Sequence, residues 1–559
     1  MSSPSKQPIK KSDNILSLDF NERCDKVNPL TDEYPFGDSL YQYPDREPLE
    51  KKIAQINRLS KEQVLCTNGG DEAIMILMRI IKEGVPFILP LPAFSQYTWG
   101  IKSWQQDVST IEAKDDLSID LEKTKQAIIN MSGAVTVLTR PNNPTGESIA
   151  ISELTELVKI SQQNNGWVFL DEAYIEFSDE DSAADSLLEK FDNLIILRTF
   201  SKAYGLAGVR LGYLLGSLRL IELFRVRCMP FNIPTPSLQI ATKALEDNNQ
   251  LEMKNYCQQV KVNRKILTDW FIDLGIKVFP SQANFVLLQL PEGQARAVKS
   301  FMKKNKILLR TFDQGELQNC LRITIPFDLE RLMYCLQQCF QPKLICIDMD
   351  GVLIDTSESY DQCVLSTVKQ LSGKSVELSA VETLRRQGGY NNDWVLSKKL
   401  LDDLGFEFSL EKVTAVFQQL YLGDKNDGLV ANETSLIGSS LMTKIKQTKL
   451  CSFAVVTGRP RLEAKSGQAL TDLSQLPLIS LDDVQAGKPS PEGIQKLQQK
   501  YSNKSWMCGD NPDDMQAAVA SNSMAIGIGK NKIESLYQAG ADIVFNDINE
   551  LEKWLCPLK

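Results

Sequence analysis

The sequence contains no histidine among its 559 residues. This absence excludes every mechanism that needs an imidazole nitrogen, including Ser-His-Asp hydrolysis, Cys-His nucleophiles and zinc sites with histidine ligands. A general base must therefore be Lys, Asp, Glu, Tyr or Cys. Long apolar segments are also missing: no window approaches 18 uninterrupted apolar residues, and the opening MSSPSKQPIKKSDN lacks an apolar core. We therefore expect no membrane span, no signal peptide and no membrane partner.

An excess of positive charge and a regular cysteine pattern are lacking too. Lys and Arg number 62 against 71 Asp and Glu, which gives a formal net charge of −9. An acidic surface repels phosphate backbones, so nucleic acid is not an expected partner. The 12 cysteines form no CxxC pair. Reduced, mostly buried thiols and a cytoplasmic location are therefore expected.

The residues that are present indicate a folded chain of several domains, because 559 residues exceed what one hydrophobic core supports. Over residues 40–216, helical patterns alternate with the short apolar runs AVTVLTR, WVFLDEAY, NLIILRTFSK and VRLGYLLG. This rhythm is typical of an α/β fold with a parallel sheet. From Asp247 a long helical pattern precedes strands around NFVLLQL and LRITI, which predicts a smaller α/β lobe that ends near Gln338.

Polar motifs follow the predicted strands of this first half. Gly69 and Gly70 precede a helical run, and a glycine turn before a helix presents backbone amides to an anion. RPNNPTG (140–146), DEAYIEF (171–177) and TFSKAYGLAGVR (199–210) each stand at the carboxyl end of a predicted strand, the edge where open parallel sheets bind ligands. An acid, an asparagine, a tyrosine, a lysine and an arginine that converge there would suit a phosphorylated pyridine aldehyde.

With these strings the sequence resembles the fold-type I aminotransferases that use pyridoxal phosphate, and most closely the histidinol-phosphate aminotransferases, over roughly residues 18–338. The resemblance implies that Lys202 condenses with the cofactor aldehyde and carries protons, and that Asp171 pairs with the pyridine nitrogen. It assigns the ring hydroxyl to Asn143 and Tyr174, the cofactor phosphate to Gly70, Asp71, Thr199, Ser201 and Arg210, and ring stacking to Phe94.

The same resemblance extends the site to substrate and to a second subunit. Arg322 in CLRIT matches the family's substrate arginine, and Arg310 in ILLR is a second candidate for a carboxylate or phosphate. Tyr43 in YQYPD matches a tyrosine that reaches the phosphate of the neighbouring subunit, which implies a homodimer. This chemistry needs no imidazole, because the released lysine moves the proton.

A second α/β unit begins at Lys343 with KLICIDMDGVLIDT, a predicted buried strand that runs into an acidic loop. About 90 residues of mostly helical pattern follow before FAVVTGRP resumes the sheet, which indicates an inserted cap. The motifs of this unit are, in order, IDMDG with Asp348 and Asp350, TGRP with Thr457, AGKPSP with Lys488, and CGDNPDDMQ with Asp510 and Asp514.

In this order the motifs resemble the phosphatase branch of the haloacid dehalogenase superfamily over residues 343–559. The resemblance implies that Asp348 is the nucleophile, which forms an aspartyl phosphate, and that Asp350 is the general acid and base. It further assigns the phosphoryl group to Thr457 and Lys488, and Mg²⁺ to Asp348, Asp350 and Asp510, with Asp514 nearby or ligating through water. The cap normally selects the substrate in this superfamily.

These patterns predict an α/β chain that joins two enzymes. We expect a fold-type I aminotransferase at 1–340, with a large domain at about 40–245 and a small lobe at about 18–39 plus 246–340. A Rossmann-like haloacid dehalogenase unit at 343–559 is expected to follow, with a core at 343–357 and 450–559 and a helical cap at 358–449.

The two resemblances imply a bifunctional enzyme of histidine biosynthesis that acts on small molecules. Its first half would transaminate imidazole acetol phosphate with glutamate, giving histidinol phosphate and 2-oxoglutarate, and its second half would dephosphorylate histidinol phosphate. Alternatives are an aromatic or phosphoserine-like specificity or a phosphothreonine decarboxylase, fused to a phosphatase for phosphoglycolate, a sugar phosphate or pyridoxal phosphate. A non-catalytic scaffold is a further alternative, although a binding module has no need of a nucleophile such as Asp348.

Overall fold

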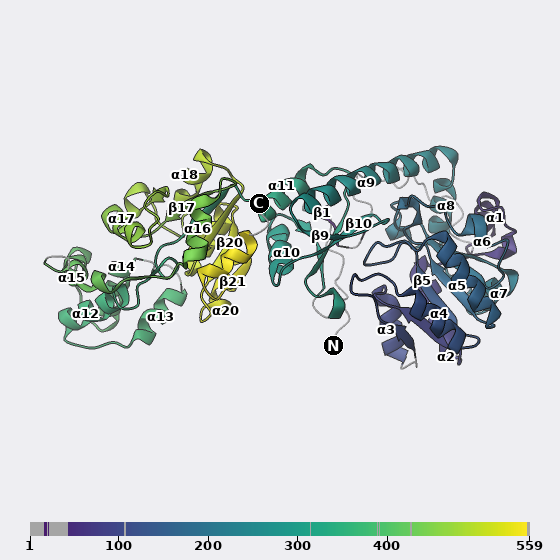
Figure 1. Cartoon of the computed structure of the whole chain (residues 1–559), viewed down its shortest axis with the longest axis horizontal. Coiled ribbons are helices and arrows are strands. Elements are labelled where there is room, and N and C mark those ends of the chain that lie inside the picture. Colours follow the sequence, from purple (N-terminus) through teal and green to yellow (C-terminus); the bar gives the residue numbers. More distant parts are fainter. Residues whose placement is uncertain are drawn as a thin grey trace. The chain divides into compact units, whose positions relative to one another are not determined.

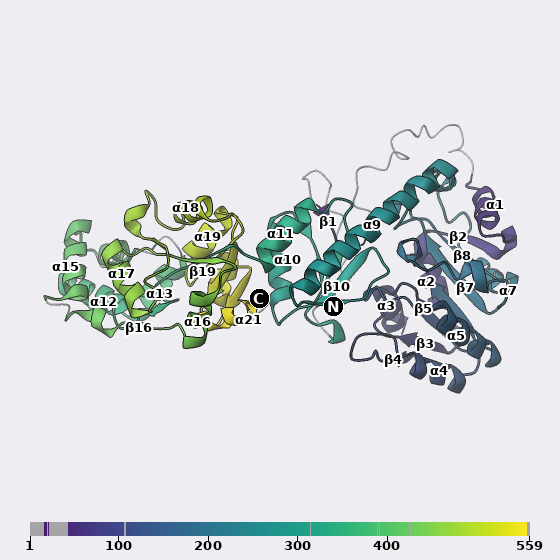
Figure 2. The same ribbon diagram turned by 45° about the horizontal axis from the view of Figure 1, so that its top comes forward.

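The structure of the chain is a computed structural model (Figures 1 and 2), which describes residues 16–19, 21, 43–104, 108–312, 315–387, 390, 392–424 and 427–555. The chain divides into two compact units. The first comprises Met1–Leu290 and Lys306–Leu329, and the second comprises Pro291–Asn305 and Glu330–Lys559. Most of the expected lobe segment at 18–39 lies outside the described residues. Within the described ranges, no helix is both long enough and apolar enough to cross a membrane.

A seven-stranded sheet forms the centre of the first unit, in the order β2-β8-β7-β6-β5-β3-β4. Its strands are β2 (Val64–Thr67), β3 (Phe87–Pro90), β4 (Ser109–Ile111), β5 (Val135–Thr139), β6 (Trp167–Asp171), β7 (Leu194–Thr199) and β8 (Gly212–Gly216). Strands β3 to β7 pair in parallel, and β8 runs antiparallel to both of its neighbours. The predicted mainly parallel sheet is therefore confirmed, and the short apolar runs of its central strands are explained because β5, β6 and β8 are buried throughout.

Helices accompany this sheet along the chain. They are α1 (Glu47–Ile56), α2 (Gly69–Lys82), α3 (Ser95–Trp104), α4 (Leu121–Asn130), α5 (Ile151–Gln163), α6 (Ala184–Leu187), α7 (Leu218–Arg225) and α8 (Thr235–Ala244). The apolar residues of α2 and α7 join Phe87, Phe169 and Leu214 of the sheet in one core. Burial of these apolar helix faces holds the helices against the sheet.

A smaller sheet completes the first unit. The long helix α9 (Asp247–Asp273) precedes β9 (Lys277–Phe279), β10 (Phe285–Gln289), β12 (Arg310–Thr311) and β13 (Cys320–Thr324) (Figure 2). These strands form an antiparallel sheet in the order β12-β13-β10-β9, and β1 (Leu16–Ser17) pairs in parallel with β11 (Ile307–Leu308). The expected long helix and the strands at NFVLLQL and LRITI are therefore present.

The second unit is built on a six-stranded parallel sheet in the order β18-β17-β14-β19-β20-β21. Its strands are β14 (Leu344–Ile347), β17 (Ser452–Val456), β18 (Leu478–Ile479), β19 (Ser505–Gly509), β20 (Met524–Ile528) and β21 (Ile543–Phe545). Helices α17 (Arg461–Leu470), α18 (Glu492–Lys500), α19 (Pro512–Ala520), α20 (Ile533–Gln538) and α21 (Glu552–Leu555) lie between or after the strands. This arrangement confirms the predicted Rossmann-like core.

Four helices, α12 (Tyr360–Ser372), α13 (Leu378–Gln387), α14 (Asp393–Asp403) and α15 (Leu410–Leu422), form the cap around a hydrophobic core of their own. A short antiparallel pair, β15 (Ile354–Asp355) and β16 (Thr434–Ser435), joins the two connections of the cap. The expected cap range of 358–449 also takes in α16 (Ser439–Gln447). That helix contacts the core instead, since Gly438 N donates to Asn549 Oδ1 at 2.7 Å and Lys444 pairs with Glu552 at 2.9 Å.

Two helices that precede the expected boundary at 340 group with the second unit. They are α10 (Gln294–Lys304) and α11 (Glu330–Phe340). Lys304 Nζ lies 2.7 Å from a carboxylate oxygen of the buried Asp542, and the indole of Trp506 donates to Gln338 O at 2.8 Å. The unit defined by contacts therefore differs from the domain defined by sequence, because these helices make polar contacts with Trp506 of β19 and with Asp542, which directly precedes β21.

Candidate active sites

The carboxyl ends of β5, β6 and β7 bring together the predicted cofactor residues of the first unit. Asn143 follows β5, Asp171 ends β6 and Lys202 follows β7. Parallel pairing of these strands places their ends at one edge of the sheet. Asn143 Nδ2 donates to Tyr174 Oη at 3.4 Å, and Lys202 Nζ lies 5.6 Å from the centroid of the Tyr174 ring.

Asp171 is a buried carboxylate held by two donors. Ala173 N donates to its Oδ1 at 3.0 Å and Tyr97 Oη donates to its Oδ2 at 2.9 Å. Burial raises the pKa of Asp171 to about 6, although both hydrogen bonds lower it. A protonated pyridine nitrogen would supply the positive charge that such a carboxylate needs, so the site fits pyridoxal phosphate. Sequence reasoning missed Tyr97, whose only local signal is its place three residues after Phe94.

The amino terminus of α2 and Arg210 form a cradle of the kind that binds phosphate. Arg210 NH2 lies 2.6 Å from Asp71 Oδ2, and both side chains are about half exposed. Gly69 has a φ of +72°, and a Cβ atom there would lie 2.5 Å from Arg210 NH2, so only glycine leaves room for the guanidinium. Gly70 is the next residue, in the first turn of the helix. A helix amino terminus and a guanidinium together favour an anion such as a phosphate.

The other predicted cofactor residues are two buried hydroxyl residues and two aromatic residues. Thr199 and Ser201 are buried at the end of β7, where Ser201 N donates to Thr199 Oγ1 at 3.1 Å. Phe94 precedes α3 and contacts the ring of the buried Tyr97 edge-on. Tyr43 is 79% exposed and stacks on Phe231 at 4.4 Å between ring centroids, so its contact is with a surface aromatic residue of its own chain.

Arg322 links the small sheet to the cofactor residues. Its NH1 donates to Asn143 Oδ1 at 2.6 Å and its NH2 donates to Asp19 O at 2.8 Å. Burial lowers the pKa of Arg322 to about 10, and its Nε is buried with no hydrogen-bond partner among the described residues. Arg310 lies opposite Arg322 in the β12–β13 register and is exposed. An unpaired Nε–H donor on a buried guanidinium suits a substrate carboxylate or phosphate.

In the second unit, the strand ends bring together a lysine and three aspartates. Lys488 Nζ lies 2.6 Å from Asp348 Oδ1 and 2.5 Å from Asp514 Oδ1. Asp348, Asp510 and Asp514 each offer a carboxylate oxygen, and these oxygens all lie within 4.8 Å of one another. Asp510 is also paired with Lys532 at 2.5 Å.

The charge of this cluster fits a divalent cation. Burial raises the pKa of Asp348 well above its usual range, and the neighbouring carboxylate of Asp514 raises it further. Although burial opposes the charged form, Asp348 and Asp514 raise the pKa of Lys488. The single positive charge of buried Lys488 does not neutralise the negative charges of the three carboxylates. Carboxylate oxygens are also the ligands that Mg²⁺ prefers. Asp348, Asp510 and Asp514 are therefore the residues that would hold it.

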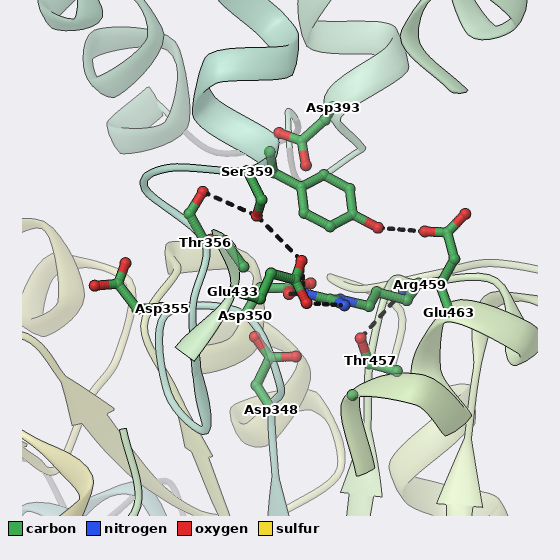
Figure 3. Close-up of polar contacts among 12 residues, drawn as sticks. Asp348, Asp350, Asp355, Thr356, Ser359, Asp393, Glu433, Thr457, Arg459 and Glu463 are labelled. Carbon is green, nitrogen blue, oxygen red and sulfur yellow. Dashed lines mark hydrogen bonds and ion pairs between the residues drawn. The ribbon is translucent and has the colours of Figure 1, made fainter. Parts of the chain in front are cut away.

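The Asp350 carboxylate points towards Arg459 (Figure 3). Its Oδ1 accepts from Arg459 Nε at 2.7 Å and lies 2.6 Å from Arg459 NH2. The Asp350 carboxylate is not one of the three whose oxygens lie within 4.8 Å of one another, so its role as a metal ligand stays a prediction. Thr457 Oγ1 accepts from Arg459 N at 3.1 Å, which fixes the loop after β17. Arg459 stands in the TGRP motif, two residues after Thr457, yet sequence reasoning gave it no role.

Comparison with known families supports both halves. The family model of aminotransferase class I and II matches residues 37–337, and that of haloacid dehalogenase-like hydrolase matches residues 342–522. Histidinol-phosphate aminotransferase 1 of Trichormus variabilis is 33% identical over 303 residues, which cover 52% of this chain and 81% of that protein. A protein of Photorhabdus laumondii named as a histidine biosynthesis bifunctional protein is 33% identical over 307 residues. That match covers 52% of this chain but only 37% of the relative.

Solved structures agree on the fold. Histidinol-phosphate aminotransferase from Sinorhizobium meliloti, solved in complex with pyridoxal-5'-phosphate, aligns with a TM-score of 0.52 and 24% identity over 58% of this chain and 89% of that one. The chain therefore belongs to the class I and II aminotransferases through its larger part, and its C-terminal part matches the model of haloacid dehalogenase-like hydrolases.

Proposed function

We propose that the chain is a bifunctional enzyme of histidine biosynthesis. Its first unit transaminates imidazole acetol phosphate with glutamate to give histidinol phosphate and 2-oxoglutarate. Its second unit is a magnesium-dependent phosphatase that acts on histidinol phosphate. The observation that carries the first activity is the convergence of Asn143, Asp171, Tyr174 and Arg322 beside Lys202 at one sheet edge.

Pyridoxal phosphate, when bound, supplies an aldehyde for condensation with amines and a ring that accepts electrons. Asp171 keeps the pyridine nitrogen protonated, because a buried carboxylate is stabilised by a cation beside it. Lys202 Nζ takes the proton from the substrate Cα and returns it during the second half of the transfer. Arg322 binds the acidic end of the substrate, to which its buried, unpaired Nε donates.

The specificity is tested by mixing purified protein, pyridoxal phosphate, glutamate and imidazole acetol phosphate, and measuring 2-oxoglutarate. We expect formation of 2-oxoglutarate that Lys202→Ala abolishes. Turnover only with aromatic amino acids, or release of carbon dioxide from phosphothreonine, would assign the first unit to one of the alternative specificities.

In the second unit, Asp348 attacks the phosphorus and the bond from phosphorus to the leaving oxygen breaks, while Asp350 donates a proton to that oxygen. Asp350 then takes a proton from the water that attacks the aspartyl phosphate, which releases inorganic phosphate and restores both carboxyl groups. Lys488 neutralises charge on the phosphoryl oxygens, and Mg²⁺ held by the three aspartates would add to this.

Carboxylates on the cap side of this site support histidinol phosphate as the substrate. Figure 3 shows Asp393 and Glu463 above Asp348 and Asp350. Arg385 pairs with Asp393 at 2.6 Å and also with Asp361, so its single charge is shared between two carboxylates. Negative potential favours a leaving group that carries an ammonium and disfavours one that carries a carboxylate, such as glycolate.

The second activity is tested by phosphate release from histidinol phosphate and from phosphoglycolate with Mg²⁺ present. We expect histidinol phosphate to be preferred, and Asp348→Asn to abolish phosphate release while 2-oxoglutarate formation continues. Preference for phosphoglycolate would refute the substrate assignment, and unchanged phosphate release in Asp348→Asn would favour the scaffold alternative.

We further propose that the first unit forms a homodimer. Val226, Met229 and Phe231 are 58–69% exposed and lie in one stretch of sequence, and Tyr43 stacks on Phe231. A patch of exposed large apolar side chains of this kind suits a second copy of the chain. Phe231→Asp is expected to shift the mass measured by light scattering towards the monomer, whereas Leu462→Asp, at an exposed position of the second unit, leaves it unchanged.

A further inference from the structure

One guanidinium in the second unit joins the proposed acid and base to the cap connections. The Arg459 side chain is 1% exposed. One part of it, Nε and NH2, contacts Asp350 at 2.7 and 2.6 Å. NH1 donates to Glu433 Oε2 at 3.0 Å, and NH2 also donates to Glu433 Oε1 at 2.9 Å. Arg459 therefore bridges a buried carboxylate and the carboxylate of the active-site loop (Figure 3).

Glu433 is the fixed end of this bridge. It lies directly before β16, on the connection by which the chain leaves the cap, and its side chain is 3% exposed. Ser359 Oγ and Tyr421 Oη both donate to Glu433 Oε1, at 3.1 and 3.0 Å. The Tyr360 ring lies 4.9 Å from the guanidinium carbon. Residues of both cap connections and of α15 therefore hold Glu433 and Arg459 in place.

Asp350 is the free end. Its side chain is 35% exposed, so it is accessible from outside the protein, unlike the buried side chains of Arg459 and Glu433. The bidentate pair with Glu433 and a hydrogen bond to Tyr421 already satisfy much of the buried guanidinium. The additional contact with Asp350 therefore does more for Asp350 than for Arg459, because a partly exposed carboxylate without this contact would sample several rotamers.

We propose that Arg459 is a positioning residue, anchored by Glu433, that fixes the Asp350 carboxyl group in the orientation from which it donates a proton to the leaving oxygen. This inference rests on the proposed phosphatase function. Glu433 acts only through Arg459. Loss of either residue should therefore impair the proton donation and spare the attack of Asp348 on phosphorus.

Two aryl phosphates separate these effects. Phenyl phosphate has a basic leaving oxygen that needs a proton, whereas p-nitrophenyl phosphate releases a stable anion that does not. The ratio kcat/KM reports the steps up to release of the leaving group. In the full chain with Mg²⁺, we expect Arg459→Lys and Glu433→Gln to lower kcat/KM for phenyl phosphate by about 10- to 100-fold, against less than about threefold for p-nitrophenyl phosphate. Asp350→Asn should show the same selectivity.

Arg461→Lys is the matched control, because Arg461 lies two residues after Arg459, at the start of α17, and pairs with Asp483 rather than with Asp350 or Glu433. Both substrates should react with it as with the unchanged protein. Equal losses for both substrates in Arg459→Lys and Glu433→Gln, or no loss in either, would overturn the positioning role. If the unchanged protein hydrolysed neither substrate, the proposed phosphatase function itself would fail, which is a different outcome.

Discussion

Lys304→Met tests whether α10 contributes to the stability of the second unit. Lys304 Nζ lies 2.7 Å from Asp542 Oδ1, and the Asp542 side chain is fully buried. Ser300 Oγ donates to the same carboxylate at 2.7 Å and Ala525 N donates to it at 2.9 Å. The substitution removes the cation and leaves these two neutral donors. A buried carboxylate without its cation is costly, so the second unit should lose stability.

The magnitude follows from what remains around Asp542. Breaking a fully buried pair typically costs about 3–5 kcal/mol. The Lys304 side chain is 30% exposed, and two hydrogen bonds to Asp542 remain after the substitution. We therefore expect the free energy of unfolding to fall by about 2–3 kcal/mol. For a unit of this size, this corresponds to a fall in Tm of about 5–10 °C.

The pH dependence of this loss has a definite sign. Burial raises the pKa of Asp542, and the charge of Lys304 is the main factor that lowers it. Without Lys304 the pKa of the folded state rises further above the value of the unfolded chain. The neutral carboxyl group is tolerated at low pH, so the loss should be small near pH 4 and should grow as the pH rises through the folded-state pKa.

Thermal unfolding followed by tryptophan fluorescence, at pH 5 and pH 8, measures this effect, because Trp506 and Trp554 are buried in the second unit. Lys303→Met on the same helix is the control, since Lys303 is exposed, and it should change Tm by no more than about 2 °C. Equal Tm values for the two variants, or a larger loss at pH 5 than at pH 8, would refute the reasoning.

Two further predictions concern the first unit. Tyr97→Phe removes the donor that most lowers the pKa of Asp171, so the protein should bind pyridoxal phosphate about tenfold more weakly at pH 6, and its affinity should recover as the pH rises. Titration with the cofactor, followed by its absorbance, measures this affinity. A loss of affinity that increases with pH would contradict the prediction. Gly146→Ala places a Cβ 2.2 Å from Ser281 Oγ and 2.9 Å from Ser281 Cα at a φ of +85°, so Tm should fall. Adding Ser281→Gly removes the contact with Oγ but not the one with Cα, so it should restore only a part of the loss. Full restoration would show that the backbone conformation carries no cost.

The sequence could predict the sites where function depends on local order along the chain. Asp171 ends and Lys202 follows an apolar run that alternates with helical patterns, which predicts a parallel strand, and the ends of parallel strands share one edge of a sheet. Asp348 follows β14 in the same manner, so the sequence could predict that it lies at the same sheet edge as Lys488. The conformation of a strand and of the turn after it depends on a few neighbouring residues, so the spacing of a motif predicts where its side chains lie along the chain.

Only the tertiary structure decided which side chains support these groups. Tyr97 is 74 positions from Asp171, and Arg459 is 109 positions from Asp350, so no periodicity or spacing links them. The helix α10 precedes the expected boundary, yet Lys304 pairs with Asp542, because a buried charge requires a partner wherever the chain can supply one. Such long-range pairings depend on the packing of whole elements, whereas the strand-end motifs depend only on the chain direction at each strand.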